Sequence, residues 1–271
     1  MRITTDDGVG LATVVAGDPD APGLLLVHGI GGAKEDFTDH FEMLAREHRV
    51  AAFDLRGHGA SDAPTDPTAY SLDRLALDTA AVVDALDLHD LRILGHSMGG
   101  MVVRRFVLAA PERVTALVLM DTSAGMPPGF APDIVAAAIE VVQTQGLTAL
   151  KELTDEMDLL GSDAYQRVLA ERPGFQEYAE YKWTAQSPVM WAAMVRDLID
   201  QPDQLSELAA LEMPTLGIVG DQDHTFIDAV EAIVATIPGA ELAVIPDAGH
   251  SPQFENPPAW FDAMARFLAR V

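Results

Sequence analysis

Short apolar runs alternate with longer segments of helical periodicity along most of this chain. Six of the runs are apolar at successive positions and flanked by glycine, proline or aspartate, which is typical of strands buried on both faces of a parallel sheet. They are residues 24–28, 49–54, 91–95, 114–121, 215–220 and 241–246. Segments with helical spacing lie between and after them, among them residues 71–88, 98–110 and 260–271. This alternation predicts an α/β fold with an open, mostly parallel sheet and helices on both of its faces.

Capping residues mark the ends of these helical segments. Ser71 is placed as the N-cap of the first segment, and Asn256 followed by two prolines is a typical start for the last one. Pro111 ends the helix that begins near residue 98. These signals place the helix boundaries to within a few residues.

The stretch from residue 125 to residue 208 interrupts the alternation. It shows helical patterns punctuated by prolines and no strand pattern. A helical insertion between two strands is most simply a cap over one edge of the sheet. We therefore expect a first core part at residues 1–124, a helical cap at 125–208 and a second core part at 209–271.

Aromatic and methionine side chains of the expected cap are candidates for a substrate pocket. Apolar side chains line many small-molecule pockets, whereas packing inside the cap's own core is the competing interpretation for each of them. The candidates are Met126, Trp183, Trp191 and Met194. The cap also contains basic residues that we expect to be solvated on its surface. They are Arg167, Arg172, Lys182 and Arg196.

The net charge excludes several kinds of partner. The 271 residues include 17 basic and 42 acidic ones, which gives a formal net charge of −25. Nucleic acids and anionic membrane surfaces bind clusters of Lys and Arg, so we expect neither of them as a partner. Both a monomer and a homodimer are compatible with this composition.

Cysteine is absent from the chain. A disulfide, a thiolate metal site and a cysteine nucleophile are therefore excluded. The first ten residues contain one arginine and no apolar stretch, so they do not resemble a signal peptide. No apolar run approaches the ~18 residues of a membrane span. We expect a soluble, cytoplasmic protein.

The sharpest chemical signal is the sequence Gly-His-Ser-Met-Gly at residues 95–99. It fits the pattern G-x-S-x-G, with an expected strand before it and an expected helix after it. In this setting a tight turn exposes the serine hydroxyl at the carboxyl edge of the sheet, and the helix N-terminus offers N–H groups to an anion. Ser97 is therefore the expected nucleophile.

A serine nucleophile needs a general base and a carboxylate that orients the base. His250 lies in the loop after the last expected strand, and we expect it to be the base, with His224 as the alternative. Asp223, in the loop after the preceding strand, is the expected acid. Two other aspartates remain alternatives for this role, namely Asp121 and Asp221. The bunched Asp221, Asp223 and His224 lack a known metal-ligand spacing, so no metal is expected.

The oxyanion formed in such a reaction needs two N–H donors. The backbone N–H of Met98, directly after the nucleophile, is one candidate. The turn His-Gly-Ile-Gly-Gly at residues 28–32 follows the first expected strand, and its glycines allow a close approach to the substrate. Ile30 is the second expected donor, with Gly29 as its alternative and as a candidate substrate contact. No Lys-Ser or Lys-Thr follows the turn, so it is not a phosphate loop.

Six motifs in this order resemble the α/β-hydrolase superfamily, in its capped branch of bacterial carboxylesterases, enol-lactonases and cofactor-free haloperoxidases. They lie at residues 28–31, 53–61, 95–100, 121–123, 220–223 and 249–250, so the resemblance covers the whole chain. It implies the α/β-hydrolase fold with an inserted helical cap and a triad of Ser97, Asp223 and His250. Epoxide hydrolases and haloalkane dehalogenases of this fold carry Asp at the position of Ser97, so those activities are not expected.

These residues lead to one functional expectation, a serine hydrolase that cleaves a neutral, medium-sized, apolar or aromatic carboxylic ester through an acyl-enzyme. Lactone opening and carbon–carbon bond cleavage by the same triad are the alternatives among enzymes. A receptor-like homologue that binds a ligand without turnover is the alternative of another class. No cofactor is expected, and the expected partner is a small-molecule ester or lactone.

Overall fold

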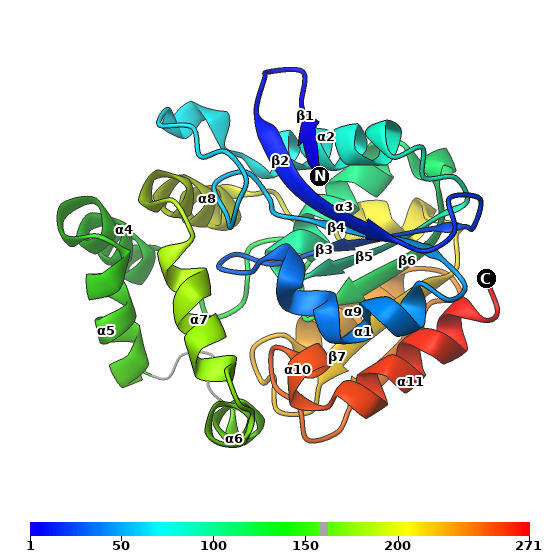
Figure 1. The fold of residues 1–271 in the computed structure, drawn as a ribbon. Coiled ribbons are helices and arrows are strands. Elements are labelled where there is room, and N and C mark those ends of the chain that lie inside the picture. Colours follow the sequence, from blue (N-terminus) through cyan, green and yellow to red (C-terminus); the bar gives the residue numbers. More distant parts are fainter. Residues whose placement is uncertain (158–161) are drawn as a thin grey trace.

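The computed structural model describes residues 1–157 and 162–271, and an eight-stranded sheet forms its centre (Figure 1). The strands are β1 (Arg2–Thr4), β2 (Gly10–Ala16), β3 (Gly23–Val27), β4 (Arg49–Phe53), β5 (Leu91–His96), β6 (Val114–Met120), β7 (Thr215–Gly220) and β8 (Glu241–Ile245). Their order across the sheet is β1-β2-β4-β3-β5-β6-β7-β8. Strands β3 to β8 are parallel, whereas β1 and β2 pair antiparallel with their neighbours. The predicted open, mostly parallel sheet is confirmed.

The six strands expected from the sequence begin and end within one residue of the observed ones. The pattern missed β1 and β2: β1 has three residues, of which one is buried, and β2 is buried only over its first four residues. The expectation of two-sided burial is wrong for β8, where Leu242 and Val244 are 39% and 47% exposed. β8 is the last strand of the sheet, so helices cover it less completely than the central strands.

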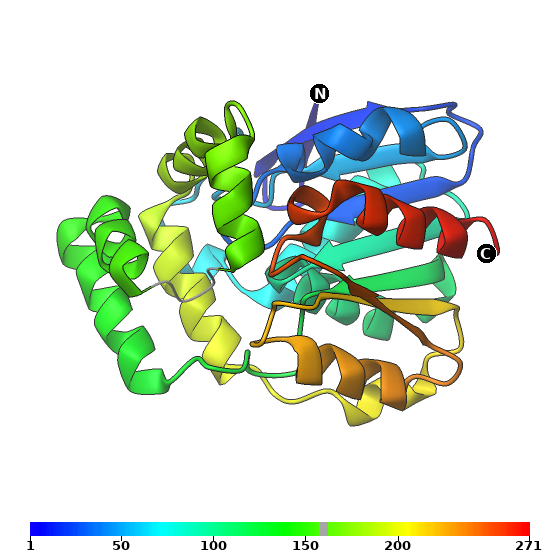
Figure 2. The same ribbon diagram turned by 90° about the horizontal axis from the view of Figure 1, so that it is seen from below.

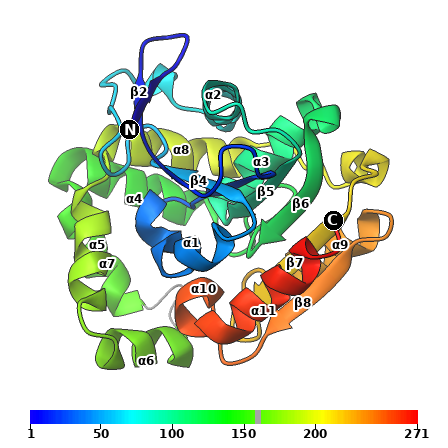
Figure 3. The same cartoon turned by 45° about the vertical axis from the view of Figure 1, so that its right-hand side comes forward.

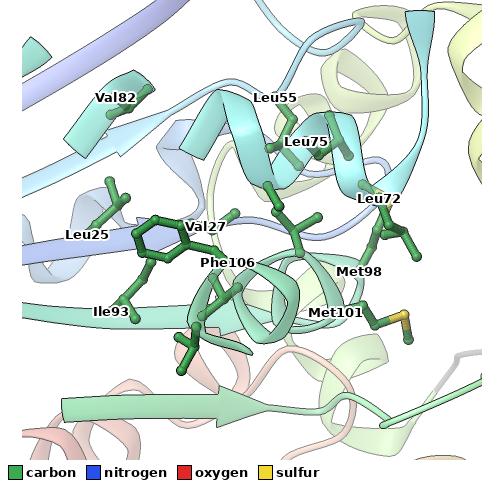
Figure 4. Close-up of a cluster of buried hydrophobic side chains, with 14 of the residues drawn as sticks. Leu25, Val27, Leu55, Leu72, Leu75, Val82, Ile93, Met98, Met101 and Phe106 are labelled. Atoms are coloured by element: carbon green, nitrogen blue, oxygen red, sulfur yellow. The ribbon is translucent and has the colours of Figure 1, made fainter. Parts of the chain in front are cut away.

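Helices cover both faces of the sheet (Figure 2). One face carries α2 (Leu72–Ala85), α3 (Met98–Ala109) and α9 (Ile227–Thr236), and the other carries α1 (Thr38–Leu44) and α11 (Pro257–Leu268). Side chains alternate along a strand, so Leu25 of β3 packs in the cluster of the first face and Leu24 in that of the second. Figure 4 shows the first cluster, with Leu25 and Ile93 near Phe106.

The expected caps begin two of these helices. The Ser71 side chain accepts a hydrogen bond from the Arg74 N–H at 3.0 Å, and the Asn256 side chain accepts one from the Ala259 N–H at 3.3 Å. Each cap satisfies an N–H group that has no partner within its own helix. No helix in the described part of the chain is both long enough and apolar enough to span a membrane.

Within the described residues, five α-helices lie between β6 and β7 and stand beside the sheet (Figure 1). They are α4 (Pro132–Gln145), α5 (Leu147–Met157), α6 (Asp163–Glu171), α7 (Phe175–Thr184) and α8 (Pro188–Asp200). Helix α8 packs against α4 through a small apolar cluster that includes Ile139 and Val195. At the other end of the group, α6 contacts the short helix α10 (Pro252–Glu255), as Figure 3 shows. These helices fall within the region expected to form a cap.

Candidate active site

Ser97 occupies the sharp turn between β5 and α3. Its backbone has φ 54° and ψ −121°, a left-handed conformation that is unusual for a residue other than glycine. The flanking glycines make this turn possible. A Cβ atom on Gly95 would lie 2.4 Å from the Gly99 carbonyl oxygen, and one on Gly99 would lie 2.3 Å from that of Val27. The turn therefore holds the serine in a strained conformation at the carboxyl ends of the central strands.

His250 lies between Ser97 and Asp223 and contacts both side chains. Its Nε2 lies 3.0 Å from the Ser97 Oγ, and its Nδ1 lies 2.7 Å from the Asp223 Oδ2. Because a carboxylate can only accept, Nδ1 carries the proton and Nε2 is free to accept one from the serine. The three expected residues thus form one hydrogen-bonded line, whereas the alternative base His224 is exposed on its loop.

The two alternative acids have other contacts. Asp121 is fully buried, and its Oδ1 accepts a hydrogen bond from the Gly220 N–H at 3.1 Å. The exposed Asp221 accepts one from the Ala248 N–H at 3.2 Å and so shapes the loop before His250. Asp223 is the aspartate whose carboxylate is hydrogen-bonded to the His250 ring.

Asp121 and Asp223 differ in charge although they are neighbours. Burial, followed by the charge of Asp223, raises the pKa of Asp121 well above its usual range. Burial alone would also raise the pKa of Asp223, but the hydrogen bond and the charge of His250 outweigh it and lower that pKa. Asp121 is therefore the neutral member of the pair and Asp223 the ionised one.

The turn at residues 28–32 is fixed by two buried histidines. His28 Nε2 accepts a hydrogen bond from the Leu55 N–H at 3.0 Å, so its Nδ1 carries the proton and donates to the Gly29 carbonyl at 2.7 Å. Because a trans peptide is planar, this bond directs the Ile30 N–H of the same peptide away from His28. The Gly31 N–H donates to His58 Nε2 at 3.3 Å, and burial lowers the pKa of His58 to about 3, which keeps that ring neutral.

Both candidate oxyanion donors are available. Within residues 1–157 and 162–271, neither the Ile30 N–H nor the Met98 N–H has a hydrogen-bond acceptor. A Cβ atom on Gly29 would lie 2.9 Å from the Ser97 Cβ, so only glycine allows the turn to approach the nucleophile this closely. The geometry suits an anion held between the turn and the start of α3.

His96 and Glu255 hold the loop that carries His250, and of these two the sequence reasoning missed Glu255. The His96 Nε2 donates to the His250 carbonyl oxygen at 2.7 Å, and burial lowers the pKa of His96 to about 3. The buried Glu255 accepts a short hydrogen bond from the Gly249 N–H. His96 stands beside the nucleophile in the motif, but nothing in the sequence links Glu255 to this loop.

A cavity of about 120 Å³ lies against Ser97 and His250. One wall is apolar and consists of Met98, Met101, Pro127, Phe130, Leu198 and Phe226. The lining also includes the turn at residues 29–32 and the charged side chains of Asp36 and Lys182. Among the expected contacts, Gly29, Ile30 and Met98 line this cavity.

The four cap candidates for the pocket are not among the residues that line it. Met126 is 47% exposed, and Met194 is completely buried in the core between α8 and the sheet helices. Trp191 packs against the cluster between α4 and α8, and Trp183 is half-buried. By contrast Lys182, expected to be a solvated surface residue, lines the cavity with its side chain 17% exposed.

The side chains of Asp121, Asp223 and His250 place one potential metal ligand each within 4.8 Å of one another. Two of them are already hydrogen-bonded to each other, since His250 donates to Asp223 at 2.7 Å. The raised pKa of Asp121 keeps that carboxyl protonated, which is unfavourable for binding a cation. The cluster therefore fits proton transfer better than it fits a metal.

Comparisons with known proteins agree with this geometry. A family model described as the alpha/beta hydrolase fold matches residues 22–257. A putative 2-succinyl-6-hydroxy-2,4-cyclohexadiene-1-carboxylate synthase of Bacillus subtilis is 28% identical, over 100% of this chain and 99% of the relative. The structure of a thermophilic esterase from Thermogutta terrifontis is 29% identical with a TM-score of 0.80, covering 100% of this chain and 98% of the esterase.

A third similar protein is Est816, described as an N-acyl homoserine lactone degrading enzyme. Its structure is 25% identical with a TM-score of 0.81, covering 98% of this chain and 100% of Est816. The family match spans most of the chain, and the sheet order, the strained serine turn and the inserted helices are all present. This chain is a hydrolase that belongs to the α/β-hydrolase fold family.

Proposed function

We propose that this protein is a serine hydrolase that cleaves a carboxylic ester or lactone through an acyl-enzyme. The observation that carries the proposal is the line of hydrogen bonds from Ser97 through His250 to Asp223, with distances of 3.0 and 2.7 Å. Nucleophile, base and orienting carboxylate are in contact, and two free N–H groups stand beside them.

In the first half of the reaction, the Ser97 Oγ attacks the carbonyl carbon of the substrate while His250 Nε2 takes the hydroxyl proton. The Ile30 and Met98 N–H groups donate to the oxyanion that forms. Asp223 stabilises the resulting imidazolium through its bond to Nδ1. The bond to the alcohol oxygen then breaks, and His250 returns its proton to the leaving oxygen.

The second half repeats these steps with water. His250 takes a proton from a water molecule, which attacks the acyl carbon bound to Ser97. The bond to Oγ breaks, the serine regains its proton from His250, and the carboxylic acid leaves. In a lactone the alcohol oxygen stays tethered to the acyl group, so the same chemistry yields a hydroxy acid.

The cavity favours a small and uncharged substrate. Its volume of about 120 Å³ is below the ~300–1,000 Å³ of pockets for drug-sized ligands, which favours short acyl chains. In the described part of the lining, the single Lys or Arg side chain is Lys182, and it is paired with Asp36 at 2.9 Å. A dicarboxylate such as the product named for the Bacillus subtilis relative would find no unpaired cation here.

Lactones are the second candidate class. Est816 supports them, because it is described as degrading an N-acyl homoserine lactone and is similar over nearly the whole chain. Esters are supported by the similarity to the Thermogutta terrifontis esterase. A panel that contains both substrate types separates the two.

The test compares the wild type with Ser97→Ala on p-nitrophenyl esters from acetate to decanoate and on N-acyl homoserine lactones. Ser123→Ala is the matched control, since Ser123 lies at the same sheet edge and donates to the Gly125 carbonyl at 2.8 Å. We expect Ser97→Ala to lose roughly 10³-fold or more in kcat and the control to retain its activity. A Ser97→Ala variant with a rate near that of the wild type would refute the mechanism.

A further inference from the structure

An ion pair between a buried carboxylate and a largely buried ammonium group is part of the cavity lining. Asp36 lies on the short 3-10 helix η1 (Lys34–Phe37), just after the candidate oxyanion turn, and Lys182 lies on α7 of the inserted helices. Both side chains line the cavity that contains Ser97, and they are 2.9 Å apart. The mechanism above uses neither of them.

Asp36 is fully engaged and ionised. Its Oδ1 accepts hydrogen bonds from the Tyr178 hydroxyl at 2.6 Å and from the Lys182 ammonium at 2.9 Å. Its Oδ2 accepts one from the Ala33 N–H at 3.3 Å. Burial alone would raise the pKa of Asp36, but the nearby charge of Lys182 outweighs it and lowers that pKa.

Lys182, in contrast, has spare hydrogen-bonding capacity. An ammonium group carries three N–H donors, and among the described residues Asp36 is the one acceptor of a Lys182 hydrogen bond. The ring centroids of Tyr178 and Phe254 lie 4.9 and 5.2 Å from its Nζ, so both rings make cation–π contacts with the group. The Lys182 side chain is 17% exposed and lines the cavity, so an acceptor in the cavity can take one of its remaining donors where few water molecules compete.

We propose that Lys182 is a specificity-determining residue that donates a hydrogen bond to an uncharged oxygen of the substrate, distinct from the carbonyl that Ser97 attacks. The substrate is then an ester or lactone with a second neutral acceptor, such as a ketone, ether or amide oxygen. Its apolar part packs on the wall that includes Met101, Leu198 and Phe226. This inference rests on the proposed function and adds the substrate class.

Charge explains why the acceptor is neutral. Asp36 already compensates the Lys182 charge, and Asp223 adds a second carboxylate behind His250. The whole chain carries a net charge of −25. A substrate carboxylate would meet this negative field without a free cation to offset it, whereas a neutral oxygen only needs a donor.

The experiment compares substrates that differ by one oxygen. The acyl series pairs p-nitrophenyl hexanoate with its 3-oxo, 4-oxo and 5-oxo forms, and the alcohol series pairs butyl butyrate with 2-oxopropyl butyrate. The p-nitrophenyl monoester of succinic acid tests a carboxylate. Each kcat/KM is divided by the rate of alkaline hydrolysis of the same ester, which removes differences in intrinsic reactivity.

The variant Lys182→Met with Asp36→Asn removes the ammonium donor without leaving a buried carboxylate unpaired, and Asp36→Asn alone measures what the new amide contributes. The matched control is Arg172→Met, which removes the ion pair between Arg172 and Asp39, 2.7 Å long and outside the cavity lining. The double variant and Arg172→Met both lose a contact between the inserted helices and the sheet domain. Only the double variant loses the ammonium donor in the cavity.

In the wild type and the Arg172→Met control, we expect the corrected kcat/KM of one oxo ester to exceed that of its counterpart without the oxo group by about 10- to 100-fold. This factor corresponds to the free energy of a hydrogen bond to a charged group. In the double variant this ratio falls to about 1, and the succinate monoester is poor throughout. A ratio unchanged in the double variant, or a preference for succinate, would overturn the inference. Calorimetry on Ser97→Ala gives the same ratio as Kd values, so the inference is tested even if the wild type cleaves no ester and the proposed function fails.

Discussion

Replacing Asp121 by Asn tests whether two adjacent carboxyl groups have the assigned charges. Asp121 is neutral in the folded protein, so an amide preserves its shape and its charge. The Gly220 N–H lies 3.1 Å from Asp121 Oδ1, and the Asn carbonyl oxygen can still accept a hydrogen bond from it. The NH₂ group of Asn takes the place of the protonated Oδ2 and carries no charge. We therefore expect kcat/KM to fall by less than ~10-fold, against ~10⁴-fold for Asp223→Asn, which forces the wrong tautomer on His250.

The same substitution has a signature in stability that depends on pH. The pKa of Asp121 is raised in the fold, whereas in the unfolded chain it is near 3.8. Between these two values the native state holds one proton more than the unfolded state. The stability that Asp121 contributes is thus complete below 3.8 and is lost as pH rises toward its pKa in the fold.

The slope of this loss is fixed by one proton, about 1.4 kcal/mol per pH unit. Asn does not titrate, so the variant lacks this loss. Above pH 4, the difference in the free energy of unfolding between Asp121→Asn and the wild type should therefore grow in favour of the variant, by up to this amount for each pH unit. Urea unfolding of both proteins at pH 5, 6, 7 and 8 measures the gap. A gap that stays constant with pH, or an activity loss as large as that of Asp223→Asn, would show that Asp121 is ionised.

Three further substitutions or substrates probe other parts of the structure. Gly29→Ala should lower kcat by ~10²–10³-fold with little change in KM, because its Cβ would lie 2.9 Å from the Ser97 Cβ and displace one oxyanion donor; a fully active variant would contradict this. Esters with acetyl to butyryl chains should give a higher kcat/KM than decanoate, because the cavity holds about 120 Å³, and an optimum at decanoate would mean that the cavity opens. Arg104→Met should raise Tm, because Arg104 is buried and burial lowers its pKa to about 9. Its side-chain hydrogen-bond partner is the neutral amide of Gln201 at 2.8 Å, which does not compensate the charge. A fall in Tm in a thermal melt would show that the charge is stabilising.

The local sequence was enough to locate the elements and the nucleophile. Strands buried on both faces and capped helices have patterns that can be recognised within a few residues. The glycines around Ser97 predict a tight turn, because a larger side chain at Gly95 or Gly99 would clash with the backbone. Chain order along the sheet then brings loops after β5, β7 and β8 to one edge. That reasoning led to Ser97, Asp223 and His250 as candidates.

Other features depend on contacts between residues far apart in the chain. Ser97 and His250 are 153 positions apart, and Asp121, Asp221 and Asp223 all end in the same region, so only the packing of their loops decides which carboxylate meets His250. β2 lies near one end of the sheet and β8 forms the other end. The antiparallel pairing of β2 and the exposure of β8 depend on these positions, which the hydrophobic pattern of the sequence does not encode.

The inserted helices show this limit most clearly. Their periodicity identifies apolar faces but does not say whether a face meets the sheet domain, a neighbouring helix or the cavity. Met194 and Trp191 therefore pack into cores, while Lys182, whose type suggests a solvated surface, lies in the cavity beside Asp36. A charged side chain is retained there because a buried carboxylate 146 positions away compensates it, and only the tertiary structure brings those two charges together.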